Sequence, residues 1–411
     1  METFGTVVVY IIMACAVTGM IVSIVKPKAQ LGKEFLAGID SIGPIFLPVA
    51  GIMAAAPYLT TFVSYVFGPV FAALQADPAM AAGSLIAVDM GGYQLAEALA
   101  ETRESWMMAT MAAYTLGGAI VFTIPVGLRM IQRRDHKFFA LGTMCGILAV
   151  PVSVLIFSMI LVVTNPVIRD AINTSGPATY VLSLAWTTVG RNLIPLLVLC
   201  VLLALGLMFI TDAMIKGFIV FGRSLEAALK IVFVLVVVDY FTGLPSRLMG
   251  ALFQFEPIIA DEADIFRALE VAGAVGIMLC GAFPMVHLIK TYLAKPLTVI
   301  GKFFHLSPEA TAGILAASAN GIALFAMFKH LKGRDKVITV AFVICSGYLF
   351  GDHLSFTANF QPSMIAPVMI AKVTGGVLGI VFAFLLAVKK ADQLEATQME
   401  LDQVVEKVVT N

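Results

Sequence analysis

Three ionisable side chains lie well inside apolar stretches of this 411-residue chain: Asp89, Asp352 and Lys372. A charged side chain within a lipid bilayer is costly unless it is paired or hydrated, so such residues mark binding sites or ion pathways. Two roles are open for the carboxylates. Each could bind a cationic ligand, or a salt bridge such as Asp352 with Lys372 could join two helices.

Aromatic residues flank both acids at helical spacing. Tyr93 follows Asp89 by four residues, one turn away if the helix is continuous, while Tyr348 precedes and Phe356 follows Asp352 by four. A carboxylate beside aromatic faces binds small organic cations through charge and cation–π attraction. The pattern favours a cation site, with ordinary packing or lipid-facing aromatics as the alternative.

Glycines beside the same acids predict helix breaks. Gly91 and Gly92 follow Asp89, and Gly351 precedes Asp352. Non-helical backbone at membrane depth is tolerated only where protein buries it or where it lines a wet cavity. These two places are therefore the best candidates for a substrate site.

Two further polar residues complete the candidate site. His353 could hydrogen-bond a ligand or relay protons beside Asp352, and Asn320 could contact a ligand or bond a neighbouring helix. The chain carries no nucleotide-binding or hydrolase motif, so we expect no enzyme activity, and we expect no metal site and no cofactor. Its zero net charge argues for no nucleic acid partner.

The elements that position these residues must be membrane helices. Hydrophobic residues make up 60% of the chain and charged residues only 13%, too few charges for a soluble protein of this size. We predict an all-α, polytopic integral membrane protein of about 10–11 hydrophobic segments, some broken or re-entrant. The segments are 4–25, 43–73, 79–99, 106–130, 138–164, 178–210, 227–244, 266–292, 308–329, 336–361 and 363–388.

Domain organisation follows from a change in composition near the C-terminus. Residues 1–388 form a transmembrane transporter domain, and the polar residues 389–411 form a cytoplasmic tail. The distribution of Lys and Arg places the N-terminus outside. A Lys-x-Phe pattern at Lys33 recurs at Lys216, which leaves open whether the chain consists of two repeated halves or repeats the pattern by chance.

Several runs resemble the ethanolamine-utilisation membrane permeases, the EutH family. The first is Ala-Val-Asp-Met-Gly-Gly-Tyr at 87–93. The others follow in family order, at 122–126, 267–271, 281–286, 318–320, 351–354 and 372–376. The resemblance covers about residues 5 to 388. Two departures, Gly321 where the family pairs two asparagines and Glu97-Ala98 where it has Lys-Glu, weaken a substrate role at those positions.

The resemblance implies a permease of the bacterial cytoplasmic (inner) membrane that admits ethanolamine, a small protonated amino alcohol. The expected partners are this substrate and membrane lipid, and formation of a homo-oligomer stays open. Asp89 would neutralise the ammonium and Tyr93 would offer a π-face, with Asn320, Asp352 and His353 as further contacts and Lys372 as a charge partner. The alternatives are a transporter of another small amine or nucleoside-like solute, and a non-transporting membrane scaffold or sensor.

Overall fold

The computed structural model describes residues 2–303, 306–319 and 321–410, and most of them are helical. The strands are one short antiparallel hairpin, β1 (Val167–Ile168) and β2 (Tyr180–Val181), in which Val167 lies opposite Val181. The prediction of an all-α architecture is confirmed.

Seven helical stretches are long and apolar enough to cross a membrane within the described residues. They are Thr3–Val25, Gln30–Ala54, Arg103–Met130, Arg133–Thr164, Trp186–Phe209, Ala268–Tyr292 and Pro362–Leu386. An eighth candidate is a pair of helices bent by 102°, Thr211–Thr242 with Leu244–Leu252. The eleven hydrophobic segments of the sequence therefore reduce to seven or eight spans plus broken segments.

Three predicted segments are broken, including the two that carry Asp89 and Asp352. The first is divided into α3 (Ile42–Ala54), α4 (Ala56–Val66) and α5 (Gly68–Ala73). The others are α6 (Ala79–Leu85), η1 (Val88–Met90) and α7 (Gly92–Leu99); and α17 (Gly333–Ser346) with α18 (Asp352–Phe360). The segment 308–329 contains α15 (Pro308–Ala319), α16 (Gly321–Met327) and η6 (Phe328–His330).

The remaining elements are continuous helices and short turns. In the first part of the chain these are α1 (Glu2–Val25), α2 (Gln30–Asp40), α8 (Arg103–Ala112), the π-helical turns η2 (Ala113–Gly117) and η3 (Ala119–Thr123), α9 (Ile124–Met130), η4 (Arg133–Asp135) and α10 (His136–Thr164). Those that follow are α11 (Trp186–Phe209), α12 (Thr211–Thr242), α13 (Leu244–Met249), η5 (Gly250–Leu252), α14 (Ala268–Phe303), η7 (Pro362–Met364), α19 (Ile365–Leu386) and α20 (Val388–Thr410).

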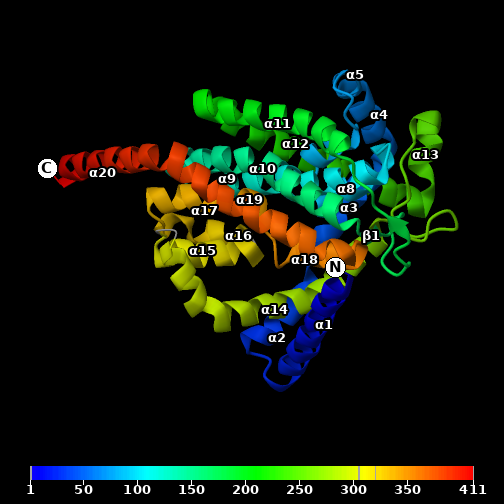
Figure 1. The fold of residues 1–411 in the computed structure, drawn as a ribbon, viewed down its shortest axis with the longest axis horizontal. Helices are drawn as coiled ribbons and strands as arrows, with labels where there is room; N and C mark the ends of the chain where they lie inside the picture. Colours follow the sequence, from blue (N-terminus) through cyan, green and yellow to red (C-terminus); the bar gives the residue numbers. More distant parts are fainter. Residues whose placement is uncertain (1, 304–305, 320, 411) are drawn as a thin grey trace.

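Helices α10, α17 and α19 pack together at the centre, with α11 and α12 on one side and a lobe of α1, α2 and α14 on the other (Figure 1). Small residues allow this close packing, as is common between membrane helices. Gly146 faces Ile344 of α17, and Gly375 of α19 lies against Ser153 of α10. Helices α15 and α18 lie between this centre and the lobe, since both contact α14 while α15 also contacts α17 and α18 also contacts α19.

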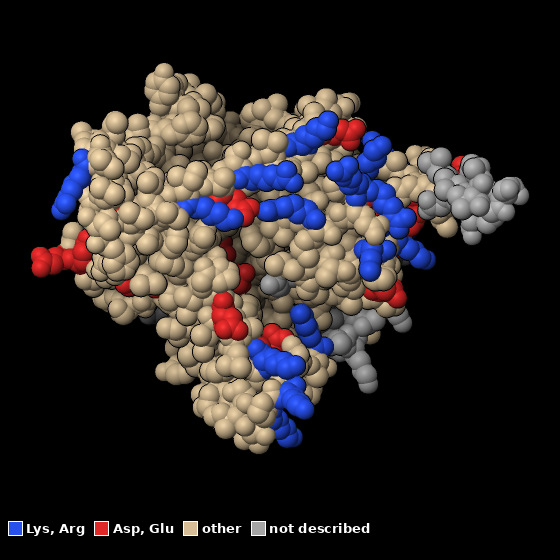
Figure 2. Space-filling view, turned by 180° about the vertical axis from the view of Figure 1, so that it is seen from behind, with Lys and Arg blue, Asp and Glu red and all other residues tan. Residues whose placement is uncertain are grey.

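The C-terminal helix α20 extends from one end of the molecule (Figure 1). Its first turns are attached to the helical body, since Glu395 accepts a hydrogen bond from the backbone N–H of Gly333 and Gln398 donates one to the carbonyl of Arg134. Lys and Arg side chains gather toward this same end, as the space-filling view shows (Figure 2).

Candidate functional site

The first break places Asp89 in a single 3₁₀ turn between α6 and α7. The carbonyl of Ala87 accepts hydrogen bonds from the backbone N–H groups of Met90 and Gly92, so these two N–H groups are paired within the turn itself. Gly91 then adopts the left-handed conformation, with φ of +94°, and the chain changes direction. Asp89 therefore lies on irregular backbone just before the start of α7, where the helix dipole favours a negative charge.

Gly91→Ala tests whether this turn sets the position of Asp89. A left-handed conformation costs a non-glycine residue about 1–2 kcal/mol. An added Cβ would also lie 2.5 Å from Cγ2 of Ile52 on α3. We expect Gly91→Ala to lower both thermal stability in detergent and uptake per folded molecule. Gly217→Ala in α12 is the control, because nothing lies within 4 Å of its added Cβ. Wild-type behaviour of both variants would contradict this account.

The second break lies between α17 and α18. Tyr348 has φ of +59°, a strained conformation for a bulky side chain of the kind that concentrates at functional sites. Its N–H donates to the carbonyl of Ala317 at 3.0 Å, and the N–H of Phe350 donates to that of Ser318 at 2.8 Å. The irregular backbone of this break is thus hydrogen-bonded to the end of α15. Asp352 follows as the first residue of α18, again where the helix dipole favours an anion.

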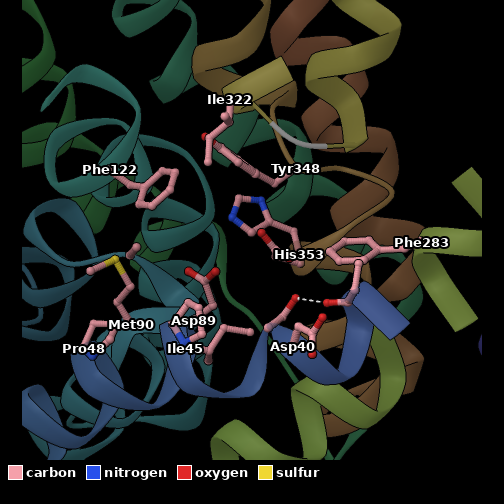
Figure 3. Close-up of a pocket in the computed structure, with 16 residues that line it drawn as sticks. Asp40, Ile45, Pro48, Asp89, Met90, Phe122, Phe283, Ile322, Tyr348 and His353 are labelled. Atoms are coloured by element: carbon pink, nitrogen blue, oxygen red, sulfur yellow. Dashed lines mark hydrogen bonds between the residues drawn. The ribbon is translucent and has the colours of Figure 1, made fainter. Parts of the chain in front are cut away.

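The two breaks and the α2–α3 junction enclose a cavity of about 360 Å³ (Figure 3). Asp89 and His353 point into it from opposite sides, and the rings of Phe122, Tyr348 and Phe283 surround them. Seen from behind, acidic side chains lie in and around a hollow between the lower lobe and the rest of the molecule (Figure 2). The cavity therefore combines aromatic walls with acidic groups.

The cavity attracts positive charge. Asp40, Asp89 and Asp352 line it, and the described lining residues include no Lys or Arg. Neither Asp89 nor Asp352 forms an ion pair with any described residue. The two carboxylates are close enough to interact electrostatically with each other. Carboxylates in a partly buried, apolar setting are neutralised either by protonation or by a cation that enters from outside.

The structure brings only some of the predicted site residues together. Asp89, Asp352 and His353 line the same cavity, and Gly91 and Gly351 adjoin them at the two breaks. Gly92, the other predicted glycine, begins α7, and its missing Cβ leaves room for the carbonyl oxygens of Ile86 and Ala87. Asn320 lies outside the described residues, although its neighbour Ile322 lines the cavity.

Tyr93 lies away from the cavity. The expectation that it faces Asp89 one turn along a continuous helix is wrong, because the chain changes direction at Gly91. The Tyr93 ring instead packs on Trp106 and Phe356, at centroid distances of 4.7 and 5.4 Å. Its hydroxyl accepts a hydrogen bond from Gln361.

Lys372 is fully buried and forms no salt bridge with Asp352. Its Nζ donates to the backbone carbonyl of Tyr114 at 3.0 Å, within the π-helical turn η2. The alternative in which Asp352 and Lys372 simply join two helices is therefore not what the structure contains. Lys372 interacts with Asp89 only electrostatically, through space.

Asp40, Phe122 and Phe283 are among the lining residues that the sequence did not indicate as site residues. Asp40 ends α2 just before Ser41 and Pro44, and its side chain is exposed at the cavity mouth. A helix end next to a proline segment was the available signal. Phe122 and Phe283 lie in the runs 122–126 and 281–286, which resemble the family, but an aromatic residue in an apolar helix is otherwise indistinguishable from a packing residue.

An aromatic plug, which consists of Tyr93, Tyr114, Phe356 and Phe360, packs behind the cavity wall, where the Tyr114 ring contacts the ring of His353. Phe356 and Phe360 stack with ring centroids 4.4 Å apart. The space left among these rings and their neighbours is about 10 Å³, no more than a single water molecule needs. The plug therefore separates the acidic cavity from the part of the molecule that carries the β-hairpin.

Hydrogen bonds from Arg169 and Gln361 hold the plug in place. The Gln361 amide donates to the Tyr93 hydroxyl and to the carbonyl of Arg169, and it accepts from the N–H of Arg169. The Arg169 guanidinium donates to the carbonyls of Asn359 and Phe360 at the end of α18, where a cation is favoured by the helix dipole. The hairpin, α7 and α18 are thereby joined on the closed side.

A helical bundle with seven stretches long and apolar enough to span a membrane, and with a cavity at broken helices, is typical of integral membrane transport proteins. The family model described as "Ethanolamine utilisation protein, EutH" matches residues 4–386. The chain belongs to this family.

Three relatives have similar lengths and cover most of the chain. This chain is 33% identical over 386 residues to the probable ethanolamine permease EutH of Listeria monocytogenes serotype 1/2a (strain 10403S). The alignment covers 94% of this chain and 95% of that protein. The chain is 34% identical to the probable ethanolamine permease EutH of Escherichia coli (strain K12), covering 90% and 88%. It is 32% identical to the uncharacterized protein YxeR of Bacillus subtilis (strain 168), covering 91% and 93%. No solved structure matches the chain.

Proposed function

We propose that this protein takes up ethanolamine, as its protonated cation, across the bacterial cytoplasmic membrane. The observation that carries the proposal is a cavity lined by Asp89 and Asp352, without Lys or Arg among the described lining residues and with aromatic walls. Such a site favours a small ammonium ion over neutral or anionic solutes. The names of the relatives, probable ethanolamine permeases, support the same substrate.

In the proposed complex, different residues bind the ammonium end and the hydroxyl end of the substrate. Asp89 and Asp352 neutralise the ammonium, and Phe122 and Tyr348 face it with their rings. The side chain of His353 lines the same cavity and is the proposed partner of the substrate hydroxyl. Asn320 remains a proposed second partner for that hydroxyl.

Uptake of labelled ethanolamine into proteoliposomes tests the proposal directly. The purified protein is reconstituted and uptake is measured across pH, with and without an imposed proton gradient. We expect saturable uptake that unlabelled ethanolamine inhibits, with no inhibition by ethylene glycol, which lacks the charge, or by propionate, which carries the opposite one. Stronger inhibition by a larger amine or a nucleoside would favour the other substrate class, for which a cavity of about 360 Å³ has room. Absence of any uptake would favour a scaffold or sensor.

We further propose that transport proceeds by alternating access, with the aromatic plug as the gate on the hairpin side. The concentration of Lys and Arg at the opposite end supports a cytoplasmic location for α20, so the closed side faces outward. The N-terminus is proposed to lie outside as well. The Arg169 and Gln361 bonds would then break each time the cavity opens to the exterior.

Arg169→Gln is expected to favour the outward-open state. The variant removes hydrogen bonds from a charged donor, each worth about 1.5–3 kcal/mol, so opening should become more frequent by about tenfold or more. The frequency of opening is measured by cysteine labelling. Thr110, a residue beside the plug, is replaced by cysteine in a background without the native cysteines, and a thiol reagent is added from the hairpin side. The exposed Arg191→Gln variant is the control. Equal labelling rates in both variants would remove Arg169 from the gate.

A further inference from the structure

Lys372 is an unusual buried lysine. Its side chain has 0% exposure, and no carboxylate of the described residues lies within ion-pair distance of its Nζ. Lys336, the other lysine buried in the part of the chain that the structure describes, has the expected arrangement, with Asp135 at 2.8 Å. A buried ammonium without a directly paired carboxylate is costly, so the position of Lys372 calls for a functional explanation.

The position of Lys372 is fixed by packing on both sides. Its backbone carbonyl accepts a hydrogen bond from Ser346 of α17, and the carbonyl of Ala371 accepts one from Ser153 of α10. Its Nζ donates to the Tyr114 carbonyl and lies 5.9 Å from the centroid of the Tyr114 ring. The ammonium is therefore held at one place in the wall behind the cavity.

One layer of side chains separates this ammonium from the cavity. The Tyr114 ring packs against the ring of His353, with centroids 5.0 Å apart, and His353 lines the cavity. Lys372 interacts electrostatically with both His353 and Asp89 through this layer. In a medium of low dielectric constant such an interaction is much stronger than in water, so a substrate in the cavity experiences the charge of Lys372.

The charges around the cavity leave room for a single positive charge. When Asp89 and Asp352 are ionised and Lys372 is protonated, the carboxylates contribute two negative charges and Lys372 contributes one positive charge, so one negative charge remains uncompensated. Asp40 is exposed to water at the mouth, where its charge is screened. The other titratable groups that face this region are neutral in their ordinary forms: Tyr114, Cys345, Tyr348 and His353.

We propose that Lys372 is a specificity-determining residue that restricts the cavity to singly charged amines and rejects diammonium ions. The inference rests on the proposed function and goes beyond it, because attraction by carboxylates alone would favour a dication over a monocation. Lys372 supplies the repulsive element that specificity against a more highly charged competitor requires. The second positive charge of a diamine would have no free carboxylate and would face Lys372 across His353.

Ethylenediamine is the probe, because it has the shape of ethanolamine with an amine in place of the hydroxyl. It is a monocation in alkaline buffer and a dication in acidic buffer, whereas ethylamine remains a monocation in both. In the wild-type protein we expect ethylenediamine to inhibit ethanolamine uptake in alkaline buffer. In acidic buffer its half-inhibitory concentration should rise by about tenfold or more relative to that of ethylamine, because charge repulsion is strong in a low-dielectric site. Ethylamine has the same charge in both buffers, so its own change measures the effect of pH on the site, and the ratio of the two compounds isolates the second positive charge.

Lys372→Met removes the repulsion and should reverse the preference. We expect the dication to inhibit this variant in acidic buffer and labelled ethylenediamine to enter the proteoliposomes. Lys372→Arg, which keeps the charge, should still exclude the dication. Lys230→Met, which removes an exposed lysine paired with Glu226 on α12, should behave as the wild type.

Two results would overturn the inference: equal inhibition of the wild type by the monocation and the dication, or continued exclusion of the dication by a folded Lys372→Met variant. If the Lys372→Met variant fails to fold, inhibition of the wild-type protein by the monocation and by the dication still tests the inference. Thermal stabilisation by each compound reports binding without transport. Charge-selective binding in the absence of uptake would therefore refute the proposed transport and leave the role of Lys372 intact.

Discussion

Replacement of Asp89 by asparagine is expected to abolish saturable ethanolamine uptake at low substrate concentration while the protein remains folded in the membrane. The substitution keeps the size and polarity of the side chain and removes its charge. A hydrogen bond to a charged group contributes about 1.5–3 kcal/mol, so the apparent affinity should fall roughly ten- to more than a hundredfold. Uptake measured over a wide range of substrate concentrations, per amount of folded protein, gives this loss.

Asp40→Asn is the matched control for Asp89→Asn. Both acids line the cavity, but Asp40 is exposed at its mouth, where water and salt screen its charge. We expect only a small, salt-dependent loss of uptake in this variant. Unchanged uptake by Asp89→Asn would remove Asp89 from the substrate site, and equal losses in both variants would indicate attraction by the overall charge rather than direct contact.

Replacement of Lys336 by methionine is expected to produce the largest loss of stability. Lys336 Nζ and Asp135 Oδ1 are 2.8 Å apart in a buried pair that joins α17 to η4, and the other carboxylate oxygen of Asp135 has no partner among the described residues. Removal of one member of a buried pair leaves an uncompensated charge, at a cost of about 3–5 kcal/mol. The temperature at which half of the detergent-solubilised protein remains monodisperse should fall markedly.

Two further variants distinguish this effect from a general loss of packing. The double variant Lys336→Met with Asp135→Asn removes both charges and should recover much of the lost stability. Arg129→Met breaks the half-exposed pair with Glu226 on α12, for which a cost of about 1 kcal/mol or less is expected. If the single and double variants at Lys336 are equally unstable, the stability comes from packing of the Lys336 side chain instead.

Local features of the sequence predicted the fold class and both breaks of the candidate site. Proline and glycine act through their own backbone, so their effects on a helix can be predicted from a short stretch of sequence. The breaks beside Asp89 and Asp352 were expected for this reason and are confirmed. The high hydrophobic content predicted membrane helices on the same local basis.

Other features depend on contacts between distant parts of the chain. The direction of Tyr93 is determined by the left-handed turn at Gly91, and its neighbours Phe356 and Gln361 lie more than 260 residues later. The bond from Lys372 to Tyr114 also joins distant segments, and its acceptor is a backbone carbonyl, which every residue type carries. No pattern in one sequence distinguishes that carbonyl from its neighbours.

The hydrogen bonds between the break at Tyr348 and the end of α15 have a consequence for how this region responds to mutation. Both bonds join backbone atoms, from the N–H groups of Tyr348 and Phe350 to the carbonyls of Ala317 and Ser318. A substitution that changes only a side chain leaves such bonds in place. A complete mutational scan should therefore find Phe350 tolerant of residues other than proline, with intolerance concentrated at Tyr348, whose ring lines the cavity, and at Gly351, where a Cβ would collide with the carbonyl of Ala319. Tolerance here would reflect the chemistry of the main chain and would not indicate that the segment lacks a role.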